Sequence, residues 1–263
     1  MSRRGFFLKG AFVLPLVIFL GNLSLRAEDD PYPTGPEAGR KLAAELRKIK
    51  PLGSTNTHGV LKILGRGHKI PLVPMDGRVV VTETNWTVTY VTKPADTNLT
   101  EKFTVIFSPD GPNRYFYARA DAPGKLPGEP KEIASGEADI PIGGSDFWLS
   151  DLGLEFLHWP DQNRLKGDIS NSRGRYVLVS INPHPAPGHY SQVKTWIDKE
   201  ADQPTEAEAY QFNSTNKLMK RFILDKVAKN SDGSYQVKEM IMHQGENFRT
   251  HLMMDVDDDK AKN

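Results

Sequence analysis

The stretch from Arg175 to Asp255 constrains the fold more than any other part of the chain, because it is predicted to form consecutive β-strands. Its middle strand, Tyr190 to Asp198 (YSQVKTWID), is rich in β-branched and aromatic residues, which favour strands. Turn-forming segments such as Asn230 to Gly233 separate the strands. Strands joined in this way pair into a sheet with one apolar face. No catalytic motif lies along the stretch, so it predicts architecture rather than activity.

Period-two patterns elsewhere bring the expected number of strands to about ten. Arg78 to Thr92 is interpreted as one long strand, and Gly174 to Asn182, apolar on both faces, is expected to be central in the sheet. Ala120 to Gly144, rich in proline and glycine, is expected to be a surface loop. The predicted strands are Thr57 to Leu64, Arg78 to Thr92, Lys102 to Ser108, Arg114 to Arg119, Gly174 to Asn182, Tyr190 to Lys199, Glu206 to Phe212, Leu218 to Val227, Tyr235 to Met242 and Phe248 to Val256. The fold class is therefore mainly β, with an antiparallel meander.

Two segments are expected to be helical. Ala38, Leu42, Leu46 and Ile49 follow helical spacing after Thr34 to Glu37, which fits a capping box. Ser145 to Trp159 is the most apolar segment after the N-terminus, and Gly153 interrupts it, so it is interpreted as a broken helical pair that covers an open sheet. Asp146 is a candidate cap for this segment.

The N-terminus indicates export. Residues 1 to 27 combine Arg3, Arg4 and Lys9 with an apolar stretch shorter than the roughly 20 residues of a membrane span, and end at a small residue, Ala27. This is the layout of a secretory signal peptide. The paired arginines also fit a twin-arginine signal, and an uncleaved anchor is a further alternative. We expect cleavage near Ala27, a disordered leader over 28–36, one domain over 37–256 and a charged tail over 257–263.

Composition narrows the class of partner. Removal of residues 1 to 27 takes away four of the 34 lysines and arginines and none of the 33 acids, which leaves a net charge of −3. A nucleic-acid partner is not expected, because that would need a concentrated basic face. The chain has no cysteine, so it has neither disulfides nor a lipid-bearing cysteine. A soluble, monomeric periplasmic protein is expected.

The sequence contains no catalytic or metal-binding pattern that favours an enzyme. The chain has no G-x-S-x-G motif, and Gly65 to Gly67 and Gly143 to Ser145 lack the lysine of a phosphate loop. His184 and His189 lie in a proline-rich loop, where a polar turn is favoured over a weak metal site. Several carboxylates remain candidates for an acid/base pair, although turn and cap roles are favoured: Asp146, Asp151, Glu155, Asp161, Asp168 and Asp198. No catalytic residue, cofactor or metal is therefore predicted.

From Gly144 to Val256 the chain resembles the periplasmic lipoprotein-carrier superfamily, in particular bacterial LolA-like proteins of outer-membrane lipoprotein sorting. The resemblance is carried by Gly144 to Phe147, Ser150 to Leu152, Tyr176 to Ile181, Tyr190-x-x-Val193-x-x-Trp196-Ile197-Asp198, Glu208 to Tyr210, Leu218 to Lys220 and Arg249-Thr250. It covers about half of the exported chain. The sequence departs from the pattern at Ala120 to Gly144 and at Pro183 to His189, and no lid-latching arginine can be placed.

The resemblance implies a strongly curved antiparallel sheet that forms a half-open barrel, with helices on its concave side and lipid acyl chains held between them. The expected function is a soluble periplasmic carrier or binder of lipids or lipoproteins, with envelope membrane proteins as further partners. Two alternatives stay open: an envelope interaction or stress-sensing module without a cavity, and an envelope hydrolase. The methionines of the last three strands fit either a cavity or ordinary core filling. The residues expected to line the cavity are Trp86, Tyr90, Phe147, Trp148, Leu152, Phe156, Trp196, Met240 and Met254.

Overall fold

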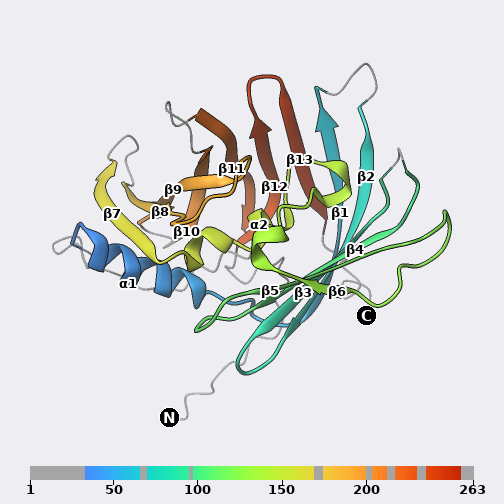
Figure 1. Ribbon diagram of the computed structural model, residues 1–263, viewed down its shortest axis with the longest axis horizontal. Coiled ribbons are helices and arrows are strands. Elements are labelled where there is room, and N and C mark those ends of the chain that lie inside the picture. The colour runs from blue at the N-terminus through green and yellow to red at the C-terminus, as the bar shows by residue number, and fades with distance from the viewer. Residues whose placement is uncertain are drawn as a thin grey trace, which may run out of the picture.

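The computed structural model describes residues 33–65, 70–94, 97–168, 174–199, 203–211, 217–229 and 235–255 (Figure 1). The predicted signal peptide, most of the predicted leader and the predicted tail lie outside these residues. The described residues form one antiparallel sheet of thirteen strands that does not close on itself. The strands are β1 Thr55–Leu64, β2 Leu72–Val81, β3 Trp86–Thr92, β4 Glu101–Phe107, β5 Arg114–Arg119, β6 Lys131–Ile133, β7 Asp161–Asp168, β8 Arg175–Ile181, β9 Tyr190–Asp198, β10 Gln203–Gln211, β11 Lys217–Lys229, β12 Tyr235–Gln244 and β13 Phe248–Asp255.

The sheet consists of two meanders that meet through the first and last strands. Strands β1 to β6 follow one another outward, β7 to β13 return inward, and β1 pairs with β13. The two edges of the sheet, β6 and β7, are therefore consecutive strands in the sequence. The chain between them, residues 134–160, must run from one edge to the other, and it lies between the two halves of the sheet (Figure 1). We call it the crossing segment.

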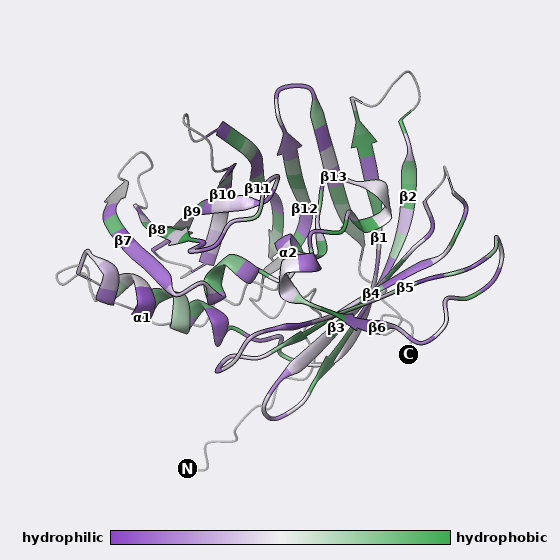
Figure 2. Cartoon of the chain, viewed as in Figure 1, coloured by the Kyte–Doolittle hydropathy of each residue, from purple (hydrophilic) through white to green (hydrophobic). Residues whose placement is uncertain are grey.

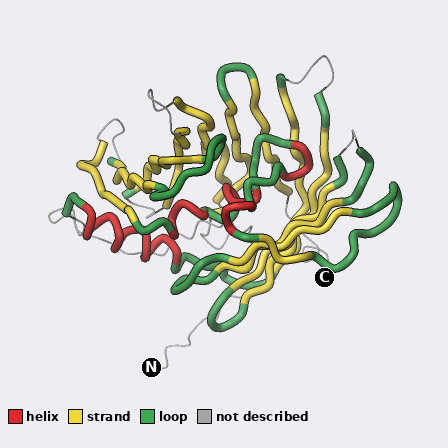
Figure 3. Tube along the Cα trace, in the orientation of Figure 1, coloured by secondary structure: helices red, strands yellow, loops and turns green. Residues whose placement is uncertain are grey.

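The crossing segment carries the short helices that pack on the sheet. It contains α2 Leu149–Leu152 and three single 3₁₀ turns, η1 Ser135–Glu137, η2 Ile142–Gly144 and η3 Glu155–His158. The longer helix, α1 Pro36–Arg47, lies along the edge strand β7 (Figure 3). A side chain at Gly39 would come within 2.6 Å of the backbone at Gln162 and Asn163, so glycine permits this close approach.

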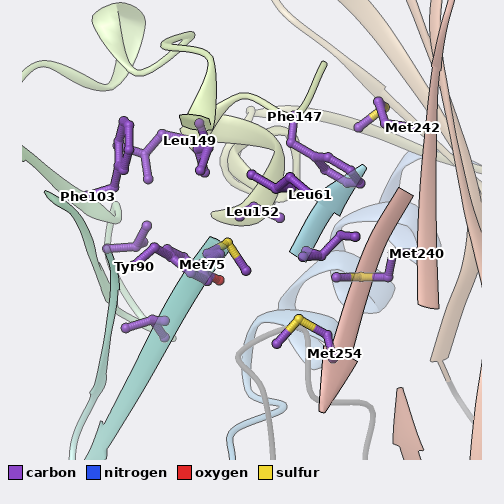
Figure 4. Close-up of a cluster of buried hydrophobic side chains, with 14 of the residues drawn as sticks. Leu61, Met75, Tyr90, Phe103, Phe147, Leu149, Leu152, Met240, Met242 and Met254 are labelled. Atoms are coloured by element: carbon purple, nitrogen blue, oxygen red, sulfur yellow. The ribbon is translucent and has the colours of Figure 1, made fainter. Parts of the chain in front are cut away.

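The first hydrophobic cluster joins the crossing segment to the strands on both sides of the β1–β13 contact. In Figure 4 the side chains of Leu149 and Leu152 lie against those of Phe103, Tyr90 and Met75. The side chain of Phe147 lies on the other side of the cluster, toward Met240 and Met242 of β12 (Figure 4). The labelled members of the cluster are Leu61, Met75, Tyr90, Phe103, Phe147, Leu149, Leu152, Met240, Met242 and Met254. Burial of this apolar surface is the main stabilising contribution to the fold.

The second hydrophobic cluster holds α1 and η3 on strands β8 to β10. Leu42, Ala43 and Leu46 of α1 pack with Phe156 and Leu157 of η3. The strand residues of this cluster are Tyr176, Leu178, Tyr190, Val193, Ile197 and Ala209. Figure 2 shows the alternation of apolar and polar residues along strands β12 and β13.

Most predicted strands are confirmed, but the interpretation of Arg78 to Thr92 as one strand is wrong. It contains the end of β2, a turn and all of β3. In the turn the Thr82 hydroxyl donates to the Asn85 backbone oxygen at 2.8 Å, and the Thr82 amide donates to the same oxygen at 2.9 Å. Period-two spacing runs unbroken from Val80 through the turn to Trp86, which hides the reversal.

Further predictions need correction at the edges. Gly174 to Asn182 is not central, because β8 is the last strand but one and packs next to the unpredicted edge strand β7. Ala120 to Gly144 contains the short edge strand β6 as well as loop. The capping box at Thr34 does not form, since Gly35 is the N-cap residue of α1 and supplies no side chain. Ser145 to Trp159 is a broken helical pair as predicted, α2 followed by η3.

Candidate functional site

The break between α2 and η3 is set by two residues. A Cβ atom at Gly153 would lie 2.3 Å from the Tyr115 hydroxyl oxygen, so only glycine fits there. Leu154, which follows, has φ 50° and ψ 41°, in the left-handed region. That conformation costs a non-glycine residue about 1–2 kcal/mol. The crossing segment is therefore sharply bent at Leu154, and its bend is held by surrounding contacts.

Asp151 ties α2 to the strands. Its Oδ2 accepts the Trp148 backbone N–H at 2.8 Å, which caps α2, and the ammonium group of Lys220 at 3.1 Å. Its Oδ1 accepts the Tyr190 hydroxyl at 2.8 Å. The cap predicted at Asp146 is wrong: Asp146 is fully buried and accepts a hydrogen bond from the Thr250 hydroxyl at 2.7 Å.

Lys220, on β11, is almost completely buried. Its ammonium nitrogen lies 3.3 Å from the centre of the Trp148 ring, in addition to its ion pair with Asp151. Burial lowers the pKa of Lys220, and the charge of Asp151 opposes that shift. A buried cation that contacts both a carboxylate and an indole face fixes the position of α2 above the sheet.

Two small apolar pockets flank Leu154. Leu154 and Pro204 line both of them. The first, which we call the apolar pocket, has a volume of about 40 Å³ between the crossing segment and strands β9 to β12. Its lining residues are Phe147, Asp151, Leu152, Leu154, Phe156, Tyr190, Val193, Thr195, Pro204, Ala207, Ala209, Lys220, Phe222 and Met242. The second, of about 50 Å³, lies between α1, the β4–β5 turn and η3.

These volumes show that the described conformation is closed. On this scale a single water needs about 10–15 Å³, so each pocket has room for a few waters but not for an acyl chain. A larger ligand would have to displace the crossing segment from the strands.

A third, larger pocket is polar and lies on the other side of the crossing segment. This polar pocket has a volume of about 310 Å³, within the range of about 300–1,000 Å³ common for ligand sites. Burial, together with the nearby charge of Asp139, raises the pKa of Glu155 to about 7, while the Tyr115 hydroxyl, which donates to it at 2.7 Å, opposes that shift. Burial, with a contribution from Arg47, lowers the pKa of His158 to about 4. The residues that line the polar pocket are Ser135, Gly136, Asp139, Ser150, Asp151, Glu155, Phe156, His158, Trp159, Pro160, Asn182, Pro183, His184, Ala186, His189 and Tyr190.

Asp139 organises one wall of the polar pocket. One of its carboxylate oxygens accepts the hydroxyl of Ser150, and the other is hydrogen-bonded to Nδ1 of His189. In a serine hydrolase the histidine contacts the serine and the aspartate contacts the histidine. Here Asp139 separates Ser150 from His189, so this arrangement does not activate the serine. Within the described residues, no three histidine, aspartate or glutamate side chains are grouped as metal ligands.

The structure separates the nine predicted cavity residues into groups. Phe147, Leu152 and Phe156 line the apolar pocket, and Trp86 lines the second one. Tyr90, Met240 and Met254 are packed in the first hydrophobic cluster. Trp148 lies over Lys220 and stacks on Tyr190, with ring centres 4.9 Å apart.

Trp196 does not join the other predicted residues. The neighbouring residues Thr195 and Ile197 face the pocket and the second cluster, so Trp196 points to the opposite face of β9. There it contacts Lys194 and Arg175, whose charged ends lie 4.8 Å and 5.8 Å from its ring centre.

Sequence reasoning missed Lys220, Leu154 and Asp139 as site residues. Lys220 is a charged residue in an alternating strand, a pattern that predicts exposure. Leu154 carries no signal for positive φ, because that conformation is rare in leucine. Asp139 lies in a segment predicted to be surface loop. Only the unusual apolar content of Ser145 to Trp159 indicated where the site lies.

A curved, open antiparallel sheet whose two edges are joined by a helical crossing segment defines a LolA-like fold. Solved structures of this class are similar to the chain over most of its length. A putative outer membrane lipoprotein-sorting protein domain from Vibrio parahaemolyticus has a TM-score of 0.62 at 21% identity, with 86% of this chain and 95% of that chain covered. A DUF1329 family protein from Desulfovibrio piger has a TM-score of 0.64 at 17% identity, with 83% and 90% covered. A LolA superfamily protein from Nitrosomonas europaea has a TM-score of 0.54 at 15% identity, with 85% and 92% covered.

The chain belongs to a family described only as an uncharacterized protein, whose profile matches residues 84–256. No curated protein matches the sequence. The similarity to lipoprotein-sorting and LolA superfamily structures confirms the resemblance drawn from the Tyr190 to Asp198 strand. Within the described part of the chain, no helix is both long and apolar enough to span a membrane.

Proposed function

We propose that the protein is a periplasmic carrier or binder of lipids or lipidated proteins that holds acyl chains between the curved sheet and the crossing segment. The observation that carries this proposal is the apolar pocket between α2, η3 and strands β9 to β12, in a chain with a LolA-like fold. The helices of the crossing segment act as a lid on the concave side of the sheet. The protein binds rather than converts its ligand and needs no cofactor.

Binding requires the lid to open. The strained residue Leu154 and the glycine before it form the bend about which α2 and η3 separate. Opening breaks the contacts of Asp151 with Lys220 and Tyr190 and exposes the wall of the apolar pocket. Each methylene of an acyl chain that enters contributes about 0.8 kcal/mol, so a chain of a dozen carbons offsets the loss of these contacts.

The N-terminal segment fits the same proposal. The protein is exported by a signal peptide cleaved near Ala27, and residues 37–256 form the single carrier domain. Exported lipids and lipidated proteins have to cross an aqueous compartment, and a lidded apolar pocket shields their chains from water.

Native mass spectrometry of the protein purified from its own periplasm tests the proposal. We expect a lipid or an acylated peptide to copurify, or an acylated peptide added to the delipidated protein to bind. If neither lipid copurifies nor acylated peptide binds, the carrier function is wrong.

A second candidate function is an envelope interaction module on the same fold with a filled sheet face. The closed packing favours it, because Leu149, Phe103 and Met240 are completely buried and the apolar pockets are small. Hydrogen exchange discriminates the two functions. A carrier loses protection in residues 147–157 more readily than in β3 and β4, whereas a filled module protects all three regions together.

A further inference from the structure

Seven of the sixteen residues that line the polar pocket come from the two segments in which the sequence departs from the carrier pattern. Ser135, Gly136 and Asp139 come from the Ala120 to Gly144 connection, and His184 and His189 come from the proline-rich loop. The contact between Asp139 and Nδ1 of His189 joins these segments across 50 residues of sequence. The pocket is therefore a feature of this chain rather than of the curved sheet alone.

The pocket offers hydrogen-bond acceptors from two carboxylates and one imidazole. Asp139 and Glu155 present carboxylate oxygens, and the bond at Nδ1 leaves Nε2 of His189 as the ring nitrogen available to a ligand. Among the described residues that line the pocket, none is a lysine or an arginine. A phosphate or carboxylate would thus meet carboxylate groups without a lysine or arginine in the lining, whereas an ammonium group would meet acceptors.

The polar pocket and the apolar pocket share a wall. Asp151, Phe156 and Tyr190 line both of them. An amphiphile that enters between α2 and η3 can therefore place its chain on one side of this wall and its polar end on the other. Aromatic rings with one polar atom, such as that of Tyr190, suit such a boundary.

We propose that the polar pocket binds the primary ammonium group of an amphiphilic cargo whose alkyl chain occupies the apolar pocket. This inference rests on the proposed carrier function and adds the chemistry of the head group. Asp139 and Glu155 accept hydrogen bonds from the ammonium group, and His189 provides a third acceptor. Primary alkyl amines are protonated at neutral pH, because their pKa is about 10.

Binding of an eight-carbon series tests the inference. Calorimetry at pH 7.5 compares octylamine, octanol and octyl phosphate, all below their aggregation concentrations. We expect octylamine to bind about ten- to hundredfold more tightly than octanol, as hydrogen bonds to charged groups predict. Octyl phosphate binds no more tightly than octanol. In addition, ethanolamine, which lacks the eight-carbon chain, shifts the ring resonances of His189, assigned by a His189→Gln variant.

Variants locate the effect. Glu155→Gln keeps an acceptor for the Tyr115 hydroxyl, and Asp139→Asn keeps an acceptor for Ser150. Both reduce binding of octylamine about tenfold or more and reduce binding of octanol by a smaller factor. Asp121→Asn, the same change at an exposed position of the Ala120 to Gly144 connection, leaves both unchanged. Circular dichroism confirms that each variant is folded.

The outcomes separate the inference from the carrier function. Equal binding of octylamine and octanol, without a shift at His189, overturns the ammonium site and leaves the carrier function standing. Absence of binding by all three octyl compounds, with a His189 shift by ethanolamine, supports the site and contradicts the carrier function. If no compound binds and no resonance shifts, both are wrong.

Discussion

Lys220 places its ammonium nitrogen 3.1 Å from Oδ2 of Asp151, and 69 residues separate the two in sequence. The side chain of Lys220 is 1% exposed, and that of Asp151 is 11% exposed. The pair joins strand β11 of the sheet to helix α2 of the crossing segment. A buried pair of this kind is sensitive to the loss of one partner, since the remaining charge loses the opposite charge beside it.

Replacing only one member of this pair is expected to destabilise the protein. Lys220→Met retains the volume of the side chain but leaves the buried carboxylate of Asp151, and should lower the free energy of unfolding by about 3–5 kcal/mol. The double variant with Asp151→Asn should lose less than the sum of the single variants. Urea denaturation measures these values.

The exposed pair Lys125 and Asp121 provides the control. Lys125→Met should change the free energy of unfolding by less than about 1 kcal/mol. An equally small effect of Lys220→Met would contradict the role of Lys220 in holding α2.

Gly153→Ala should destabilise the protein by about 2 kcal/mol or more, because the new methyl group would overlap the Tyr115 ring. The overlap also displaces Glu155, which accepts the Tyr115 hydroxyl. Gly128→Ala, at a position with open space, is the matched control. Thermal unfolding of both variants checks the expectation, and equal melting temperatures would show that the lid tolerates the methyl group.

The strands from β9 to β13 could be predicted from the alternation of apolar and polar residues, as Phe248 to Asp255 illustrates, and β8 from its continuous apolar run. Strand β7 could not, since its sequence DQNRLKGD is polar and its inward residues are Gln162 and Arg164. Their burial depends on partners elsewhere: Gln162 donates to the Phe156 and Trp159 carbonyl oxygens, and Arg164 lies over the Tyr176 ring. Local patterns do not contain this information.

The candidate site was predicted only in outline for the same reason. Phe147, Leu152 and Phe156 are apolar in a segment whose apolar content is itself a signal. Trp196 carries the same signal, but the parity of its position on β9 directs it away from the pocket. Asp151 is chemically one carboxylate among many until Tyr190 and Lys220 are brought to it.

Glu155 should make the protein less stable as the pH rises from about 4.5 to about 7. Its pKa rises from 4.5 in the unfolded chain to about 7 in the folded protein, mainly through burial. The folded state therefore binds more protons in this window, and its stabilising contribution is complete below pH 4.5 and lost through pH 7. Glu155→Gln should remove a change of about 2–3 kcal/mol between these limits.

Denaturation at a series of pH values measures this effect. Tyr115→Phe serves as a cross-check, because the Tyr115 hydroxyl lowers the pKa of Glu155 and its removal should extend the window above pH 7. If the profile of Glu155→Gln follows that of the natural protein, Glu155 is ionised in the folded state at acidic pH and the expectation is wrong.

His158 should act in the opposite direction. Burial and Arg47 lower its pKa from 6.5 to about 4, so the unfolded chain binds more protons between these values. Its stabilising contribution is present above pH 6.5 and lost as the pH falls to 4. Relative to the natural protein, His158→Gln should therefore gain stability as the pH falls from 6.5 to 4, whereas an unchanged acid profile would contradict a neutral, buried His158. Because His158 and Glu155 oppose each other between pH 4.5 and 6.5, each single variant should show a steeper dependence there than the natural protein.

Ala207→Leu should block the apolar pocket without removing any contact. Ala207 lines that pocket together with Ala209, and the small side chains of both leave room on the strand side. The larger side chain occupies a cavity of about 40 Å³ and excludes an acyl chain, so binding of an acylated peptide should fall at least about tenfold. Ala118→Leu, on β5 and outside the pocket, should bind as the natural protein does. Equal binding by both variants would show that the chain lies elsewhere, and fluorescence titration of a labelled acylated peptide makes the comparison.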